Sequence, residues 1–406
     1  MIKGCRWGLR VVALTTTTST ASSHKMDTEM AVSMSNFLQD QAARAPEQFQ
    51  EYYFIMEDLY ERKLWKQLTD KLIQFFETPE TIPLRLDLYT NFVSAFRSNI
   101  NQLKVVYIAL KAFESCSNEE AFRNLTQLIE GIDEEKFKDA YVYALVAIGR
   151  IKLVFNDLEA ARDILIKADK IIERIDYVEN IIHASYYSVS ADYYKAKADY
   201  AQYYRHCLLY LSCVDLEQLS GMEKEERAVD LSVAAILGDI YNFGELLLHP
   251  VFKVLMGTQH EWLHDLVVAM NVGDLAKYER LMAHINKIPL LQSSVSLLGQ
   301  KVRLMALIEL VFQLPPNQRT LTFHTIAKAT RIPSHEVELL IMRALSVGLI
   351  TGLIDQVAQI VNISSVQSRI LNHSQVASME TRLRDWNQNI HSLNNIVEAS
   401  GKGVFV

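Results

Sequence analysis

The stretch LTFHTIAKATRIPSHEVELLIMRALSVGLITGLIDQV, residues 321–357, determines how the rest of the sequence is interpreted. Thr322 is a candidate N-cap for a short helix that ends near Ala329, because a hydroxyl oxygen can accept from the first free N–H groups. Pro333 and Ser334 then begin a second helix, for which Ser334 is the expected cap.

The second helix has one apolar face, and paired strands follow it. Its apolar residues recur at helical spacing and predict one buried stripe: Val337, Leu340, Ile341, Ala344 and Leu345. Gly348 ends the helix, and LITGLID (349–355) and IVNIS (360–364) read as two strands around a polar turn. Two helices followed by a hairpin predict a winged helix.

A winged helix can bind nucleic acid, but the charge of this one disfavours that function. The outward positions of the second helix are nearly neutral or slightly acidic: His335, Glu336, Glu338 and Arg343. Lys328 and Arg331 alone make a poor phosphate clamp, and the whole chain carries a net charge of −7. Binding to duplex DNA therefore remains an alternative that salt-dependent affinity would reveal.

The apolar wing favours contact with proteins. Four apolar residues are expected on or beside an edge of the small sheet: Leu353, Ile354, Val361 and Ile363. An apolar edge strand is an aggregation hazard unless another chain covers it. We therefore expect partner binding by strand addition at this edge.

The last helix, expected over residues 374–399, carries a heptad seam. Its apolar residues alternate at spacings of three and four: Val376, Met379, Leu383, Trp386, Ile390, Leu393 and Val397. Fully burying one such side chain is worth roughly 1.5–3 kcal/mol, so a seam left in water would forgo about 10 kcal/mol or more. The seam predicts a bundle with helices of other subunits, and packing back onto its own domain is the alternative.

Helical hairpins fill the chain from about residue 36 to residue 314. The segments 151–165 and 194–208 align as helix, polar turn and helix, and 270–282 repeats the turn. Such hairpins bury their apolar faces only by stacking, so they predict an α-solenoid. The expected division is repeats over 31–175, a further helical part over 176–314, and the winged helix over 318–368.

The two ends of the chain differ from the middle. Residues 1–30 begin with a basic, Ser/Thr-rich segment without acids before Asp27, which is typical of either a transit peptide or a disordered basic extension. Residues 400–406 read as a flexible tail. No stretch approaches the 18 or so apolar residues of a membrane span, and the four cysteines include no C-x-x-C pair.

One motif has the form of a zinc-protease signature. HEWLH, residues 260–264, has the H-E-x-x-H form in which two histidines bind zinc and the glutamate acts as a base. The longer spacing of related proteases is missing, and the candidate third ligands, Glu279 and Glu309, are isolated acids in helical segments. An ordinary amphipathic helix is the preferred interpretation. We therefore expect no catalytic residue, metal or cofactor.

Helical repeats followed directly by a winged helix and a terminal helix resemble the PCI-domain proteins. LYERKLWKQL (59–68), YNFGELLLHPV (241–251) and EVELLIMRALSVGLITGLIDQV (336–357) are similar to a PCI subunit of the proteasome regulatory particle lid. PCI scaffolds of the COP9 signalosome or of an initiation-factor complex are the alternatives. Residues 176–314 would then be the helical part of the PCI domain.

The resemblance implies a non-catalytic scaffold in a hetero-oligomer. In that family, PCI modules associate through their winged helices, the terminal helices enter a shared bundle, and the helical arm lies near ubiquitin-receptor and deubiquitinase subunits. The resemblance also implies a location in cytoplasm and nucleus, a role in ubiquitin-dependent protein degradation, and no binding to nucleic acid or membrane.

Overall fold

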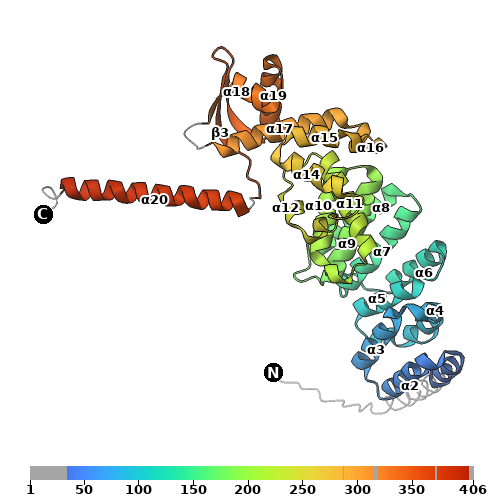
Figure 1. The fold of residues 1–406 in the computed structure, drawn as a ribbon. Coiled ribbons are helices and arrows are strands. Elements are labelled where there is room, and N and C mark those ends of the chain that lie inside the picture. Colours follow the sequence, from blue (N-terminus) through green and yellow to red (C-terminus); the bar gives the residue numbers. More distant parts are fainter. Residues whose placement is uncertain (1–33, 287, 315–318, 371–372, 402–406) are drawn as a thin grey trace, which may run out of the picture. The chain divides into compact units, whose positions relative to one another are not determined.

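The computed structural model describes residues 34–286, 288–314, 319–370 and 373–401. The chain is mainly α-helical, with repeats, a winged helix and a terminal helix in the predicted order (Figure 1). It divides into two units, one ending at Val189 and the other beginning at Ser190. The division falls inside α9 (Asn180–Lys197), later than the limit at 175 that the sequence suggested.

The first unit consists of helical hairpins. Residues 34–44 are helical, and seven labelled α-helices lead to α9: α2 (Glu47–Glu61), α3 (Trp65–Glu77), α4 (Ile82–Asn91), α5 (Gln102–Phe113), α6 (Asn118–Glu130), α7 (Lys138–Val154) and α8 (Leu158–Ile172). Neighbours pack in antiparallel pairs such as α2 with α3 and α7 with α8. Aromatic residues including Tyr53, Phe75 and Phe92 fill the space between the first helices.

One turn recurs between the helices of three hairpins, as the sequence predicted. In each, one residue has left-handed backbone geometry, with φ between 60° and 73°: Asn156, Ala198 and Gly273. The next residue is an aspartate whose carboxylate caps the following helix: Asp157, Asp199 and Asp274. The N–H of each aspartate also donates to a carbonyl five residues earlier, at 2.9–3.0 Å. This pattern closes one helix and opens the next within two residues.

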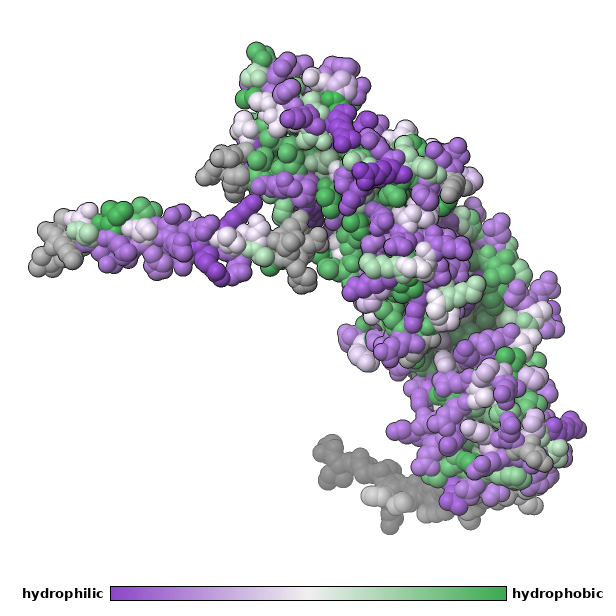
Figure 2. Space-filling view, viewed as in Figure 1, coloured by the Kyte–Doolittle hydropathy of each residue, from purple (hydrophilic) through white to green (hydrophobic). Residues whose placement is uncertain are grey.

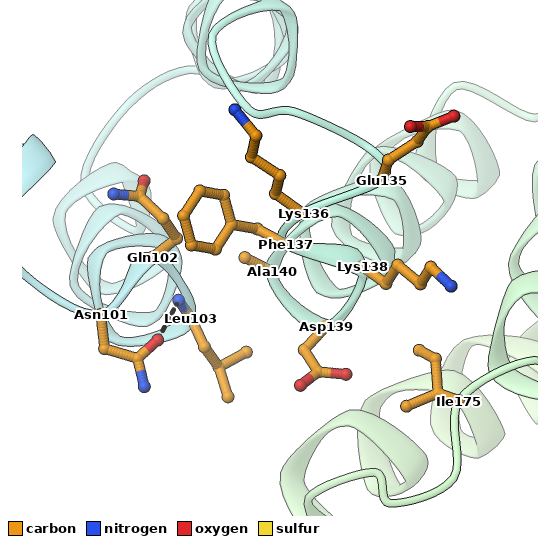
Figure 3. A pocket seen from close by; sticks show the side chains of 10 residues that line it. All are labelled: Asn101, Gln102, Leu103, Glu135, Lys136, Phe137, Lys138, Asp139, Ala140 and Ile175. Carbon is orange, nitrogen blue, oxygen red and sulfur yellow. Dashed lines mark hydrogen bonds between the residues drawn. The ribbon is translucent and has the colours of Figure 1, made fainter.

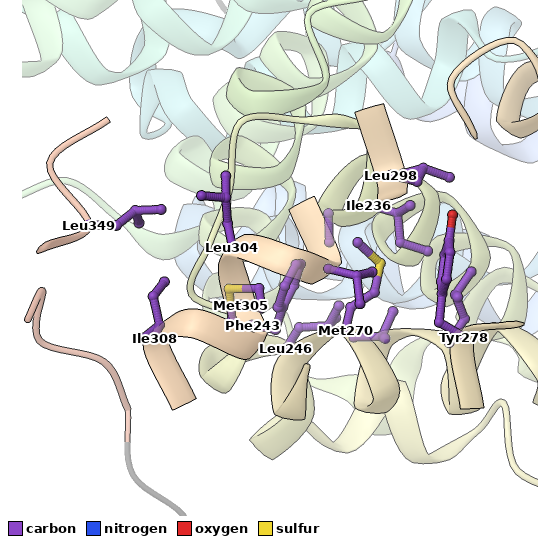
Figure 4. Close-up of a cluster of buried hydrophobic side chains, with 14 of the residues drawn as sticks. Ile236, Phe243, Leu246, Met270, Tyr278, Leu298, Leu304, Met305, Ile308 and Leu349 are labelled. Carbon is purple, nitrogen blue, oxygen red and sulfur yellow. The ribbon is translucent and has the colours of Figure 1, made fainter. Parts of the chain in front are cut away.

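The second unit is built around one long helix, α17 (Val295–Gln313). Besides the end of α9, its other helices before the winged helix are α10 (Tyr200–Cys213), α11 (Gly221–Leu237), α12 (Gly244–Leu248), α13 (Pro250–Lys253), α14 (Glu261–Val272), α15 (Leu275–Ile285) and α16 (Pro289–Gln292). Met305 and Leu304 of α17 lie in a buried cluster with Phe243, Met270 and Leu349 (Figure 4). Since Leu349 belongs to the winged helix, the helical part and the winged helix share one core.

The winged helix has the predicted order with one additional strand. Its elements are β1 (Thr320–Thr322), α18 (Phe323–Thr330), α19 (Ser334–Ser346), β2 (Ile350–Asp355) and β3 (Ile360–Val366). The sheet is antiparallel with the order β1-β3-β2, so β3 is its central strand. Within the described residues, no helix is long and apolar enough to cross a membrane.

Of the two helix caps predicted for the winged helix, one is confirmed and one is not. Thr322 caps α18 as predicted, and its hydroxyl accepts from the N–H of Thr325 at 3.3 Å. The assignment of Ser334 as a cap is wrong: Ser334 is the first residue of α19, and Pro333 precedes it without a side-chain cap. Proline has a φ suited to helix entry but no side-chain acceptor, so the first N–H groups of α19 gain no such bond.

A buried lysine closes the end of α11. In its charged form the side chain of Lys301, on α17, donates to the carbonyl oxygens of Ala235, Ile236 and Gly238 at 2.7, 3.1 and 2.7 Å. These carbonyls lie at the carboxyl end of α11, where a positive charge also complements the helix dipole. Burial lowers the pKa of Lys301 from 10.5 to about 7, against a smaller opposing effect of Asp239.

This lysine predicts a pH-dependent stability. Between pH 7 and pH 10 the unfolded chain binds a proton at Lys301 that the folded chain has released, so the free energy of unfolding rises with pH. The expected slope is at most about 1.4 kcal/mol per pH unit, and Lys301→Met should lack it. Urea unfolding of the wild type and Lys301→Met at several pH values measures the difference between their free energies of unfolding. The contributions of other titrating groups cancel in this difference. Parallel pH profiles would show that the folded chain keeps Lys301 charged throughout.

Candidate protein-interaction surfaces

The terminal helix α20 (His373–Gly401) exposes the whole predicted seam. Its seven seam residues, from Val376 to Val397, are 41–63% exposed, and Ile396 adds an eighth exposed apolar side chain that the heptad pattern missed. Figure 2 shows hydrophobic side chains on the surface of this helix among hydrophilic ones. Their binding to partner helices stays a prediction, but their exposure leaves them accessible for it.

The wing exposes less apolar surface than the sequence suggested. Leu353 on β2 is 77% exposed, whereas its neighbour Ile354 is partly buried. Among the described strands β2 pairs only with β3, so its outer edge is open for another strand. Strand addition at β2 therefore remains possible in geometric terms, with Leu353 as its most exposed apolar side chain.

Val361 and Ile363 do not lie on an exposed edge of the sheet, as the sequence analysis had expected of these partner-contact candidates. Both lie on the central strand β3 and are only 1% and 2% exposed. Successive side chains of a strand point to opposite faces, so Val361 and Ile363 share the face that packs on the core. They belong to the same buried cluster as Phe323 and Ile341, and they stabilise the winged helix itself.

The second helix of the winged helix presents apolar side chains to solvent. Leu339 and Met342, one turn apart on α19, are both exposed, and the sequence had not singled them out. Glu336 is exposed on the same helix, and Arg343 donates to the side-chain oxygen of Gln300 at 2.6 Å. An exposed leucine and methionine at its centre do not fit a helix that reads DNA, which needs donors and positive charge.

The HEWLH motif is divided between a turn and a helix. His260 is the residue before α14, and Glu261 is the first helical residue. The ring of His264 stacks on Phe252 at 4.7 Å, and Trp262 stacks on His284. Among the described residues, no group of three or more His, Cys, Asp or Glu side chains could hold a metal ion. The motif therefore contributes packing.

A cavity of about 340 Å³ lies in the first unit, beside the start of α5 and α7 (Figure 3). Charges of both signs line it, including Lys136, Lys138 and Asp139, with Phe137 and Leu103 beside them. Asn101 caps α5 by accepting from the N–H of Leu103 at 3.0 Å. No serine, cysteine or histidine is among the residues that line this cavity.

Three protein-family models match the chain. The model of PSD13 N-terminal repeats matches residues 52–267, the PCI domain matches 275–365, and the Rpn9 C-terminal helix matches 369–401. The hairpins, the winged helix and the terminal helix thus define a PCI-domain protein. The chain belongs to the family of 26S proteasome regulatory subunits named Rpn9 or non-ATPase regulatory subunit 13.

Relatives in this family are similar over nearly their full length. The probable 26S proteasome regulatory subunit rpn9 of Schizosaccharomyces pombe is 78% identical over 381 residues, which cover 94% of this chain and 100% of the relative. The subunit RPN9 of Saccharomyces cerevisiae is 40% identical, covering 86% and 93%. The non-ATPase regulatory subunit 13 homolog B of Arabidopsis thaliana is 33% identical, covering 89% and 97%.

Proposed function

We propose that this chain is a non-catalytic scaffold subunit of the 26S proteasome regulatory particle lid. The observation that carries this proposal is the exposed seam of α20, in a chain whose relatives are 26S regulatory subunits. A helix that exposes eight large apolar side chains is stable in water only where other helices cover them. Its role is to bring subunits together, and through them to support ubiquitin-dependent degradation.

The two surfaces fit two kinds of contact with other PCI subunits of the lid. The seam of α20 supplies one helix to a shared helical bundle, and the edge of β2 with Leu353 adds a strand or packs against a neighbouring winged helix. Ubiquitin-receptor and deubiquitinase subunits lie near the helical arm in this arrangement. The chain would act in cytoplasm and nucleus as part of a hetero-oligomer, without binding nucleic acid or membrane.

The test is purification of the chain, tagged at its amino end, from the cells that express it, followed by native mass spectrometry of the intact complex. We expect the chain to copurify with stoichiometric amounts of the other lid subunits. A tagged chain that ends at residue 372 and so lacks α20 but keeps Arg369 and Ile370 is the matched comparison, and it should recover far less of the lid. A full-length chain that purifies as a monomer would refute the scaffold function.

A further inference from the structure

Residues 367–370, which we call the strap, connect β3 to α20 and are held on the body of the second unit. The N–H of Gln367 donates to the carbonyl of Leu349 at 2.8 Å. The guanidinium of Arg369 forms an ion pair with Glu309 of α17 and lies 5.0 Å from the ring centre of Phe312. The strap is thus bound to the winged helix at one end and to α17 beyond it.

The next residue of the strap fits closely against α12. A Cβ atom added to Gly244 would come within 2.5 Å of the Cβ of Ile370. Only glycine leaves room for this side chain, which gives a physical reason for the FG pair in the segment 241–251. Ile370 and Arg369 therefore fix two successive positions of the strap by different kinds of contact.

The ion pair is unusually well buried for a connecting segment. The side chains of Arg369 and Glu309 are only 7% and 17% exposed, although sixty residues separate them in the sequence. Connections usually run over the surface with exposed polar side chains. Desolvating an arginine is costly, and here Glu309 and the ring of Phe312 offset that cost in part, because the buried Nη1 of Arg369 has no hydrogen-bond partner among the described residues. Such a contact holds the chain in one place.

The strap determines where α20 begins. Three Cα steps separate Ile370 from His373, so the first residue of α20 lies no more than about 11 Å from Ile370. If the strap were released, the connection would run from Val366 to His373, which is seven steps and reaches about 27 Å. The contacts of Arg369 and Ile370 thus more than halve the reach of the helix.

We propose that the strap is a positioning element that holds the start of α20 close to the winged helix, so that the seam and the β2 edge engage one assembly together. This inference rests on the scaffold function proposed above. Two linked sites bind more tightly when the connection is short, and the gain falls with about the −3/2 power of its length. Lengthening the connection from three steps to seven therefore weakens binding roughly 4-fold, and adding twenty residues to the original three steps would weaken it roughly 20-fold.

The experiment measures the affinity of the full chain for a lid purified without this subunit. The first variant has twenty Gly and Ser residues inserted between positions 371 and 372, which lengthens the connection and leaves every strap contact in place. We expect its affinity to fall roughly 20-fold with an unchanged midpoint of thermal unfolding. The same insertion after residue 401, beyond α20, is the matched control and should keep the wild-type affinity.

The second variant, Arg369→Ala, removes the ion pair of the strap without lengthening the chain, while the contacts of Gln367 and Ile370 stay. We expect binding to weaken by at most roughly 4-fold, the value for a fully released strap. Arg331→Ala is its control: Arg331 forms an exposed ion pair with Glu279 in the same unit, and losing this pair should have no effect on affinity.

Three outcomes would decide against the inference or its basis. Wild-type affinity of the insertion variant would overturn the positioning role. A loss of thermal stability in Arg369→Ala with unchanged affinity would show that the strap serves folding alone. If the wild-type chain itself failed to bind the lid, the scaffold function would be refuted before the strap is tested.

Discussion

Replacing Leu383, Trp386 and Ile390 by aspartate is expected to abolish incorporation into the lid while leaving the rest of the chain folded. These three side chains are exposed on α20, so the buried core of the second unit loses nothing. In a helical bundle each of these side chains would be covered, and losing that burial costs about 2 kcal/mol per residue. Burying the new carboxylate adds a further cost. Together they should weaken binding by at least about 1000-fold.

The measurement is the fraction of the variant bound to the lid in competition with the wild-type chain. A matched control places the same three charges on the opposite face of α20, at Thr381, Gln388 and Asn395, which are exposed and lie off the seam. This control should bind like the wild type, because its charges stay in water. Equal loss in both variants would point to charge rather than burial, and normal incorporation of the seam variant would refute the bundle.

Periodicity made most of the fold predictable. The heptad of α20 and the stripe of α19 depend only on the spacing of apolar residues, and both gave the correct element. The hairpin turns were visible because an aspartate cap follows a left-handed residue each time. Local rules of this kind act within a few residues, so the sequence displays them directly.

The arrangement of the strands was not equally visible. Periodicity assigns Val361 and Ile363 to one face of β3, but only the pairing of β1 on its far side makes β3 central. β1 has three residues, too few for a pattern, so the sequence presented a two-stranded wing with both strands at an edge. In β2 the adjacent Leu353 and Ile354 cannot both face inward, and the sequence alone did not decide between them.

Contacts between distant segments were the least predictable. Arg369 and Glu309 are sixty residues apart, and Lys301 caps a helix that ends at Leu237. Each is an ordinary charged residue in its local sequence, and Glu309 was considered there only as a zinc ligand. The exposed pair Leu339 and Met342 was missed for a related reason, because apolar residues in an amphipathic helix are normally assigned to the core.

Gly273→Ala is expected to cause a large loss of stability. Gly273 occupies the left-handed position of the α14–α15 turn, with φ of 73°, and an added Cβ would lie 2.5 Å from the backbone N and Cα of Ala306. The equivalent turns carry Asn156 and Ala198, so the turn itself tolerates a side chain. The difference lies in the close approach of this one turn to α17. Backbone strain and overpacking together should lower the free energy of unfolding by about 3 kcal/mol.

Gly299→Ala is the matched control, since Gly299 lies inside α17 and an added Cβ meets no atom within 4 Å. There alanine should raise stability by about 0.5–1 kcal/mol, because glycine is the poorer helix former. Urea unfolding measures the change in the free energy of unfolding for both variants. Hydrogen exchange of peptides from α14 and α17 reports where in the second unit the unfolding takes place. If both variants unfolded at the same urea concentration, the close approach of Gly273 to Ala306 would not require glycine. The turn would then be able to move away from α17 and accommodate the added methyl group.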